Sequence, residues 1–345
     1  MTQRRVRVAV LSGGRSSEHD ISLASAASVI AALDPERFDV LAIEIGREGR
    51  WELPVAGGAA LLPGASSPIV PATPGPPLDV DVVLPILHGP FGEDGTVQGL
   101  CEMLGVPYVG AGVLGSALAM DKSVCKAVLR DAGIVTAPSV TVLAHRDDPD
   151  DPALRDRIEV ELGFPVFVKP ARLGSSVGIS KAHDRAELVT AMALAFAHDD
   201  KVLVEQFIEG REVECGVLGN ESPIASAVGE IVPHNEWYDF EAKYAEGGSD
   251  IVIPARLTAE ETAGIQRTSL AAFDACDLAG LARIDFFLQA DHTIVLNEIN
   301  TMPGFTSTSV YASLFAADGL SYAELLTRLI DLALERHERR SRLRF

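Results

Sequence analysis

This sequence of 345 residues has few cysteines, fewer basic than acidic residues and no long apolar run. The formal net charge of −20 excludes the extended basic surface that binds a polyanion, so nucleic acid is not an expected partner. The four cysteines contain no CxxC pair, which argues against a disulfide framework or a metal role and is typical of small buried residues in a reducing compartment. They are Cys101, Cys125, Cys215 and Cys276.

Two signals of membrane insertion or export are also missing. No run of 18 apolar residues is present, and the apolar run near the N-terminus covers only Val8 to Leu11 before two glycines. These absences predict neither a membrane-spanning helix nor a secretory signal peptide, so we expect no membrane partner and a cytoplasmic location. The Walker A pattern and a G-x-G-x-x-G after a strand are absent too, so neither common phosphate-binding signature applies.

The most informative stretch that is present runs from residue 281 to 310. Residues 281–288 and 293–299 are apolar and β-branched or aromatic, and the turn residues 289–292 separate them, which predicts a β-hairpin. If the turn pairs Leu288 with Thr293, then Asp285 lies opposite Leu296 and Arg283 opposite Glu298.

Alternation along this hairpin predicts one charged face and one apolar face. Asn300 joins Arg283, Asp285 and Glu298 on the charged face. The apolar face is interrupted by Asn297 alone and otherwise holds Ile284, Phe286, Leu288, Val295 and Ile299.

The charged face is suited to a metal ion. In this register Asp285 and Glu298 are diagonal neighbours, roughly 5 to 8 Å apart at the backbone. Two carboxylates and the Asn300 amide oxygen are hard ligands of the kind that Mg²⁺ accepts alongside water and substrate phosphates. The alternative is an exposed acidic strand pair in which Arg283 and Glu298 form a cross-strand ion pair.

The N-terminal part reads as a doubly wound α/β unit. Strands are predicted at 6–11, 38–45, 80–87 and 106–109, with helices at 17–33, 96–104 and 122–132. Ser17 and Asp20 resemble a capping box, which would make Glu18 an ordinary first-turn acid. The glycine-rich loop 88–95 follows the carboxyl end of a strand, where open α/β sheets bind ligands. The Pro- and Gly-rich segment 54–77 is predicted to be a surface excursion.

The middle of the chain carries a candidate phosphate site. A buried strand at 166–170 ends in Lys169, and the flexible loop 171–179 that follows offers backbone N–H groups and two hydroxyls. By composition alone this loop is a plain turn, and the strand-end lysine favours the phosphate role. The strand 201–208 then leads into a segment resembling an inter-lobe hinge, where Glu212 is placed to take ribose hydroxyls.

The remaining segments complete three expected units. Strands at 213–218 and 224–231, a long loop at 233–254 typical of a lid, and helices at 258–278 and 322–336 precede a frayed basic tail at 337–345. We expect an N-terminal α/β domain at 1–115, a small lobe at 116–208 and a C-terminal lobe at 209–345, the last with the lid at 233–254 and the hairpin at 281–300.

Motifs in order along nearly the whole chain resemble the D-alanine–D-alanine ligases of the ATP-grasp superfamily. They are Gly13-Gly14 with Glu18, His88-Gly89 with Gly92-Glu93-Asp94-Gly95, Met120-Asp121-Lys122, Lys169-Pro170 with Gly174-Ser175-Ser176-Val177-Gly178, Glu241-Ala242-Lys243-Tyr244, Arg283-Ile284-Asp285, and Asn297-Glu298-Ile299-Asn300-Thr301 with Pro303-Gly304. One departure is Leu173, where many relatives have an acid.

The resemblance implies an ATP-grasp fold, of mixed α/β and α+β class, behind the doubly wound domain. It also implies a reaction in which ATP phosphorylates the carboxylate of one D-alanine and the amine of a second attacks the acyl phosphate. The dipeptide serves peptidoglycan precursors. A homodimer is the family expectation, with two Mg²⁺ ions per site and Mn²⁺ tolerated.

By the same resemblance, specific residues acquire roles. Lys122 and Lys169 contact ATP phosphates, Glu205, Gln206, Phe207 and Ile208 hold adenine, and Glu212 holds the ribose. The other nucleotide-binding residues are Gly174, Ser175, Ser176, Val177, Lys243, Asn297 and Glu298, and the metal ligands are Asp285, Glu298 and Asn300.

The resemblance places the amino-acid substrates next to these residues. Glu18 pairs with the ammonium of the first D-alanine through a network with Ser175 and Tyr244, and His88 lies nearby. Arg283 and the Gly304 N–H stand at the oxyanion, while Ser309 and Val310 meet the carboxylate of the second D-alanine.

Other functions remain open at this stage. The EAKY string around Tyr244 favours an amine acceptor, but another carboxylate–amine ligase or a D-alanine–D-lactate ligase is an alternative. A catalytically silent nucleotide-binding regulator is a third, against which the intact set of lysine, arginine and metal ligands argues.

Overall fold

The computed structural model describes residues 4–52, 79–233 and 249–344. The first unit is a four-stranded sheet in the order β3-β2-β1-β4, in which β1 (Val6–Gly13) runs parallel to β2 (Phe38–Ile45) and β4 (Val82–Pro85). The short β3 (Trp51–Glu52) adds an antiparallel edge. Helices α1 (His19–Ala32) and α2 (Thr96–Leu104) belong to this unit. The predicted doubly wound arrangement is therefore confirmed.

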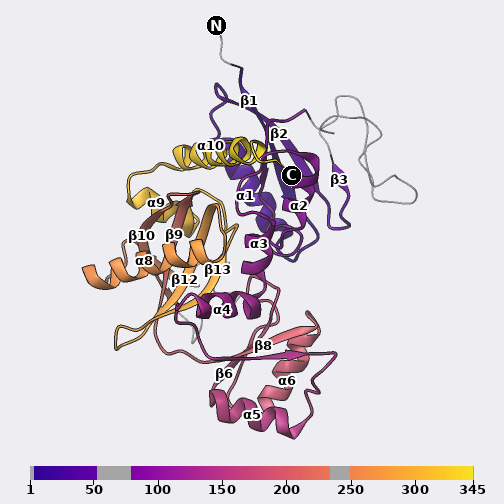
Figure 1. Cartoon of the computed structure of the whole chain (residues 1–345), viewed down its shortest axis with the longest axis vertical. Helices are drawn as coiled ribbons and strands as arrows, with labels where there is room; N and C mark the ends of the chain where they lie inside the picture. Colours follow the sequence, from indigo (N-terminus) through magenta and orange to yellow (C-terminus); the bar gives the residue numbers. More distant parts are fainter. Residues whose placement is uncertain (1–3, 53–78, 234–248, 345) are drawn as a thin grey trace.

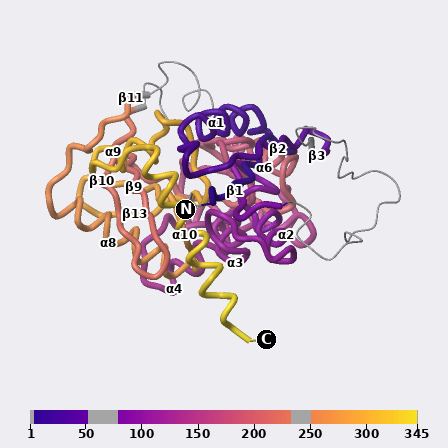
Figure 2. Tube along the Cα trace, turned by 90° about the horizontal axis from the view of Figure 1, so that it is seen from above, coloured from indigo at the N-terminus to yellow at the C-terminus, as the bar shows by residue number. Residues whose placement is uncertain are grey.

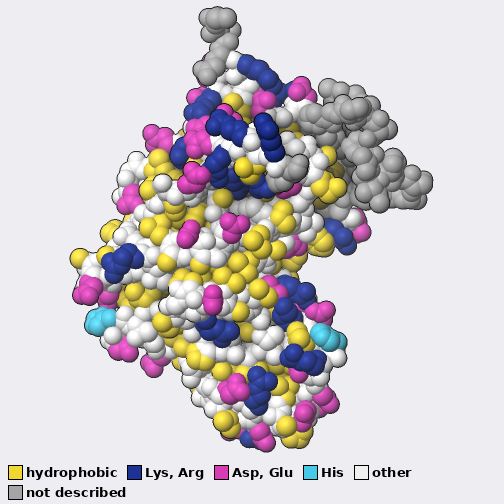
Figure 3. Space-filling model, viewed as in Figure 1, with side chains coloured by type: hydrophobic (Ala, Val, Ile, Leu, Met, Phe, Trp, Pro, Cys, Tyr) yellow, Lys and Arg dark blue, Asp and Glu magenta, His cyan; other side chains and the backbone are white. Residues whose placement is uncertain are grey.

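The small lobe is a second sheet, in the order β5-β8-β6-β7, with its own core. Its strands are β5 (Ser139–Leu143), β6 (Val166–Pro170), β7 (Ser180–Ala182) and β8 (Lys201–Gln206), all antiparallel. Helices α5 (Pro152–Leu162) and α6 (Arg185–Phe196) contribute Ile158 and Met192 to a separate apolar cluster. Figure 1 shows this lobe at the end of the molecule away from β1, and the outline narrows above it in Figure 3.

The third sheet carries the hairpin and lies between the other two units (Figure 1). Its order is β11-β10-β9-β12-β13, built from β9 (Arg211–Gly219), β10 (Ile224–Pro233), β11 (Ser249–Val252), β12 (Gly280–Leu288) and β13 (Ile294–Asn300). Helix α8 (Ala259–Ala275) packs on β9 and β10. Helices α3 (Val113–Met120) and α4 (Lys122–Asp131) connect the first unit to the small lobe.

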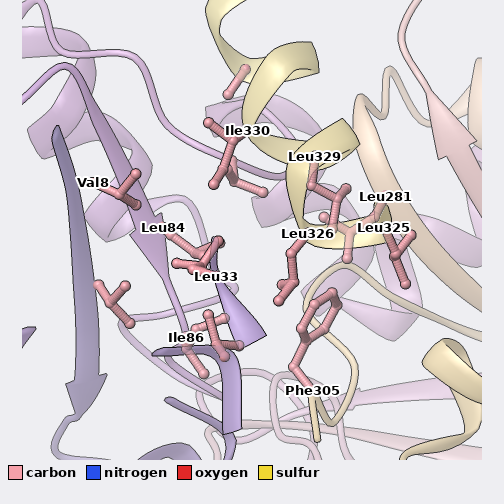
Figure 4. Packing of buried hydrophobic residues seen from close by; sticks show 14 of the residues in the cluster. Val8, Leu33, Leu84, Ile86, Leu281, Phe305, Leu325, Leu326, Leu329 and Ile330 are labelled. Carbon is pink, nitrogen blue, oxygen red and sulfur yellow. The ribbon is translucent and has the colours of Figure 1, made fainter. Parts of the chain in front are cut away.

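The last helix ties the C-terminal sheet to the first one. After α9 (Val310–Ala317), α10 (Tyr322–Ser341) crosses the N-terminal unit close to β1 in both views (Figures 1 and 2). Its Leu326 and Leu329 enter one fully buried cluster with Val8 and Leu84 of the first sheet and Phe305 of the chain after β13 (Figure 4). Two units distant in sequence are thereby held in fixed contact.

Several local predictions are wrong. The predicted strand 106–109 is only an isolated bridge between Val83 and Tyr108. The predicted frayed tail is helical up to Ser341, because Arg340 of the last turns pairs with Glu102 at 2.7 Å. Part of the predicted lid loop is a strand, β11, which pairs with β10.

The remaining boundaries are close to expectation, and some elements were not foreseen. The helices α3, α5, α6 and α9 and the strands β3, β5 and β7 had no counterpart in the sequence reading. Each sheet falls within one of the three expected ranges, and the domain boundaries themselves stay a prediction. The segment 54–77 lies outside the described residues. Among the described residues, no helix is both long and apolar enough to cross a membrane.

Candidate active site

The hairpin exists, but its register differs from the predicted one. Leu288 pairs with Ile294, and a bulge between Asp285 and Phe286 then shifts the pairing, so that Asp285 lies directly opposite Glu298. The loop is one residue longer than predicted because the Gln289 N–H donates to the Thr293 carbonyl and His292 takes a left-handed φ of 68°. The predicted pairs Leu288–Thr293, Asp285–Leu296 and Arg283–Glu298 are therefore wrong.

The observed register places the acids directly opposite each other instead of on a diagonal. Arg283 pairs with Asn300 in the same register as Asp285 with Glu298, so all four share one face as predicted. The extra residue allows both Asn297 and Glu298 to line the same cavity.

The bulge also corrects the predicted apolar face. Leu296, predicted opposite Asp285, instead joins Ile284, Phe286 and Leu288 in the apolar cluster beneath the sheet. Val295, predicted on that face, is buried opposite Phe287 instead. Asn297 does not interrupt the apolar face, because the bulge turns it towards the cavity.

A third acid extends the row across the sheet. Glu214 on β9 is the register partner of Asp285 on the side away from Glu298. The Arg283 guanidinium lies between the acids: its Nε and Nη2 each donate to one Asp285 oxygen at 2.8 Å, and Nε is 3.0 Å from Glu214 Oε2. Burial opposes the charge on Arg283, but Asp285 and Glu214 outweigh it and raise the pKa of Arg283 well above its usual value. The alternative ion pair with Glu298 is thus replaced by one with Asp285.

A cavity of about 360 Å³ lies between the small lobe and this row of acids. Lys169 and Ser176 enter it from the small lobe, and Asp285, Asn297 and Glu298 from the hairpin. The hinge segment closes it with the residues predicted for adenine and ribose, namely Glu205, Gln206, Phe207, Ile208 and Glu212.

The backbone N–H groups of the hinge residues differ in whether they already donate to a carbonyl. The Gln206 N–H donates to the Pro138 carbonyl and the Phe207 N–H to the Pro165 carbonyl. In the described part of the chain, no such bond is found for the Ile208 N–H. Of these three hinge N–H groups, that of Ile208 is therefore the one without a backbone acceptor at the cavity wall.

Two lysines lie close to the cavity beside the hairpin residues Asn297 and Glu298. Lys169 contacts Glu205 Oε2 and lies 3.5 Å from Asn297 Oδ1. Lys122 donates to the Leu173 carbonyl at 2.6 Å and lies 3.7 Å from Glu298 Oε2. Burial opposes the charged form of Lys169, but Glu205, Glu298 and Glu212 raise its pKa above the usual value. Lys169 thus remains a cation at neutral pH.

The loop after Lys169 reaches the N-terminal unit. The Ser175 hydroxyl donates to Glu18 Oε1, which joins two predicted site residues 157 positions apart. Ser175 and Ser176 both adopt left-handed φ angles, 49° and 57°, a tight turn that brings the loop against Glu18. Glu18 is the N-cap of α1 but makes no capping hydrogen bond, so the predicted Ser17–Asp20 capping box is wrong.

A clamp of N-terminal side chains holds the chain after the hairpin. His88 Nδ1 is 2.9 Å from the Met302 carbonyl, and Glu93 Oε1 accepts the Met302 N–H at 2.9 Å, so both sides of one residue's backbone are gripped. Ser25 Oγ accepts the Phe305 N–H and contacts His88 Nε2. Burial lowers the pKa of His88, although Glu18 opposes this. A neutral His88 that donates through Nδ1 fits these contacts.

The clamped segment contains Gly304, and Ser309 follows it. Ser309 is the N-cap of α9, and its hydroxyl accepts the Thr306 N–H at 2.9 Å, so it organises this turn. Val310 is the first residue of α9. The predicted Lys243 and Tyr244, with the rest of the string from Glu241, lie outside the described residues.

Comparison with known families decides the identity of this arrangement. A family model described as D-ala D-ala ligase C-terminus matches residues 128–331, and one described as D-ala D-ala ligase N-terminus matches residues 7–111. The chain belongs to the D-alanine–D-alanine ligase family.

Individual relatives agree with this assignment over their full length. The D-alanine–D-alanine ligase of Geobacillus thermodenitrificans is 48% identical, with 99% of each chain covered. The structure of the D-alanine–D-alanine ligase from Coxiella burnetii has a TM-score of 0.85 at 35% identity, covering 98% of this chain and 97% of the other. The D-Ala:D-Ser ligase VanG of Enterococcus faecalis has a TM-score of 0.82, also at 35% identity, covering 96% and 100%.

Three residues around this ligase site were not assigned a role from the sequence. The sequence could have identified Glu214 as a site residue, because alternation along the strand places it on the same face as Glu212. Glu93 stood inside a quoted motif, but its contact with Met302 spans 209 positions and has no local signal. Lys126 lies one helical turn beyond Lys122 and would ordinarily be taken for a solvated helix residue.

The clamp predicts a pH-dependent stability for this ligase. Burial, with Glu18 adding to it, raises the pKa of Glu93 to about 8, despite N–H donors at both oxygens. The folded state therefore keeps a proton that the unfolded chain releases near pH 4.5, and the Glu93 contribution is full below that pH and lost as the pH rises towards 8. Glu93→Gln cannot titrate. We expect wild-type stability relative to this variant to fall by about 1 to 3 kcal/mol between pH 5 and 9.

Urea unfolding at pH 5, 7 and 9 measures this difference, with the exposed Glu335→Gln as the control. A difference between wild type and Glu93→Gln that stays constant across the three pH values would contradict the assignment.

Proposed function

We propose that ATP binds in the cavity between the small lobe and the hairpin and phosphorylates the carboxylate of a first D-alanine. The amine of a second D-alanine then attacks the carbonyl carbon, phosphate leaves, and D-alanyl-D-alanine forms for peptidoglycan precursors. A carboxylate is a poor acyl donor, so the phosphate is needed as a leaving group. The observation that carries this proposal is that the row of acids and Lys169 line one cavity, with Lys122 3.7 Å from Glu298 at its edge.

The nucleotide is oriented by the cavity walls in this proposal. Adenine lies against Phe207 and accepts from the Ile208 N–H, and Glu212 accepts from the ribose hydroxyls. The triphosphate lies between Lys122 and Lys169, covered by the loop of Gly174, Ser175, Ser176 and Val177, with Asn297 and Lys243 completing the site. Its charge requires local cations, since the protein as a whole is acidic.

The residues at the hairpin fit a magnesium site. Asp285 and Glu298 are direct cross-strand partners, and the Asn300 amide contacts Asp285 Oδ2 at 2.9 Å. Rotating that amide presents its oxygen instead of its nitrogen. No group of three or more His, Cys, Asp or Glu in the described residues is arranged to hold a metal alone. Phosphate and water oxygens would therefore complete the coordination of two Mg²⁺ or Mn²⁺ ions. Such ions neutralise charge that develops on the transferred phosphoryl group.

The amino acids lie on the opposite side of the phosphates. Glu18, which accepts from the Ser175 hydroxyl, binds the ammonium of the first D-alanine, with His88 beside it. Arg283 and the Gly304 N–H face the oxyanion that forms when the amine attacks. Ser309 and Val310 bind the carboxylate of the second D-alanine. The clamp on Met302 sets the position of Gly304 relative to Arg283.

The acceptor is the finer part of this proposal. The VanG structure is as similar in identity as that of the Coxiella ligase, so D-serine is a second candidate acceptor. An assay of phosphate release with D-alanine alone, and with D-alanine plus D-serine, D-lactate or L-alanine, separates the candidates. We expect D-alanine alone to give ADP and the dipeptide at the highest rate. A mixed product formed faster than D-alanyl-D-alanine would overturn the assignment.

Arg283→Ala tests the oxyanion role. We expect turnover to fall by about 10² to 10³ because one positioned donor is lost. ATP affinity, measured by calorimetry, should stay within a few-fold of wild type, because Arg283 does not line the nucleotide cavity. Near-normal turnover would refute the role.

Assembly and location are a separate part of the proposal. The substrates are small molecules, and we propose a homodimer acting in the cytoplasm, where ATP is available. All four cysteines are buried free thiols, which suits a reducing compartment.

A further inference from the structure

Lys126 is a buried cation that the proposed mechanism does not use. It lies on α4 with 2% of its surface exposed, and its Nζ is 2.7 Å from Glu205 Oε1. A lysine is rarely buried to this extent without a specific partner. Lys126 does not line the nucleotide cavity, so any effect on ATP must pass through Glu205.

Glu205 connects Lys126 to the phosphate site. Its second oxygen contacts Lys169, so one carboxylate lies between two ammonium groups. Burial would raise the pKa of Glu205, but Lys126 and Lys169 overcome this and lower it to about 2. The Lys126 and Lys169 ammonium groups both form ion pairs with this one carboxylate, so the trio carries one net positive charge.

That net charge depends on Lys126. Without it, Glu205 and Lys169 would cancel each other, and the end of Lys169 that faces the cavity would be held by a carboxylate with no other partner. Glu212 and Glu298 add further negative charge around Lys169. Lys122, which lies 3.7 Å from Glu298 Oε2, is the lysine left to offset it. In a partly desolvated cavity, one unit of charge near a triphosphate changes affinity by an order of magnitude or more.

We propose that Lys126 is a positioning residue for ATP, which neutralises Glu205 and so leaves the charge of Lys169 available to the phosphates. The inference rests on the proposed placement of ATP. It predicts a larger effect on ATP binding than on adenosine binding, because the phosphates carry the charge that Lys126 influences.

Lys126→Gln tests this most directly, since its amide keeps a polar group beside Glu205 Oε1 but carries no charge. At pH 8 we expect ATP to bind about 10- to 100-fold more weakly than to wild type, and adenosine to bind within about threefold. The double variant K126Q/E205Q leaves Lys169 as the only charge of the trio. It should restore the ratio of ATP affinity to adenosine affinity to within about threefold of wild type. Calorimetry measures both ligands, and thermal melting confirms folding.

A matched control removes another buried cation. Arg336 on α10 contacts the Tyr108 carbonyl at 2.9 Å and lies over the Tyr108 ring, outside the cavity. Arg336→Met should lower the melting temperature and leave the ratio of ATP to adenosine affinity unchanged.

The outcomes are distinguishable. If wild type binds ATP but K126Q binds it equally well, or loses ATP and adenosine in proportion, the inference is overturned and the proposed function stands. A folded K126Q/E205Q that does not recover the ratio of ATP affinity to adenosine affinity also overturns it. If wild type itself does not bind ATP, the proposed function fails and this inference fails with it.

Discussion

Compensation of buried charge is the constraint on which this site depends. Glu214, Asp285 and Glu298 lie side by side across β9, β12 and β13, and adjacent buried carboxylates are stable only when cations are close. Arg283 serves the first two acids, and Lys122 lies near the third. A metal ion at Asp285 would share that carboxylate with Arg283. The guanidinium would then lie beside the groups that react.

Packing between distant parts of the chain sets the geometry around these charges. Helix α10 inserts its leucines between the first sheet and the segment after β13, so the N-terminal unit and the C-terminal sheet share one core. The loop with His88 and Glu93 can then grip Met302, and Glu18 can meet Ser175 of the small lobe. The small lobe has a separate core, which is consistent with a cavity that closes over a nucleotide.

Alternation and motif order predicted the main features correctly. A strand period of two was enough to place Arg283, Asp285, Glu298 and Asn300 on one face, because that inference survives a change of register by two residues. The bulge at Asn297 was not predictable, since an extra residue in one strand leaves no mark in the hydrophobic pattern. It moved Leu296 and Val295 to faces opposite to those expected.

Residue roles that depend on tertiary contacts could not be predicted from local sequence patterns either. Local capping rules assigned Glu18 to the helix dipole, but the folded chain turns its carboxylate to Ser175. Lys126 looks like a solvated lysine until Glu205 is brought against it from a strand about 80 positions away. The family motifs contain Glu93, yet only the fold shows that it holds the backbone next to Gly304.

A crystal structure with ADP, Mg²⁺ and D-alanine tests the central claim most directly. The account predicts metal density between Asp285, Glu298 and Asn300, with the β-phosphate between that density and Lys169 and the base at the Ile208 N–H. Metal ions bound elsewhere, with the Arg283–Asp285 pair undisturbed and the hairpin acids facing only protein groups, would contradict it.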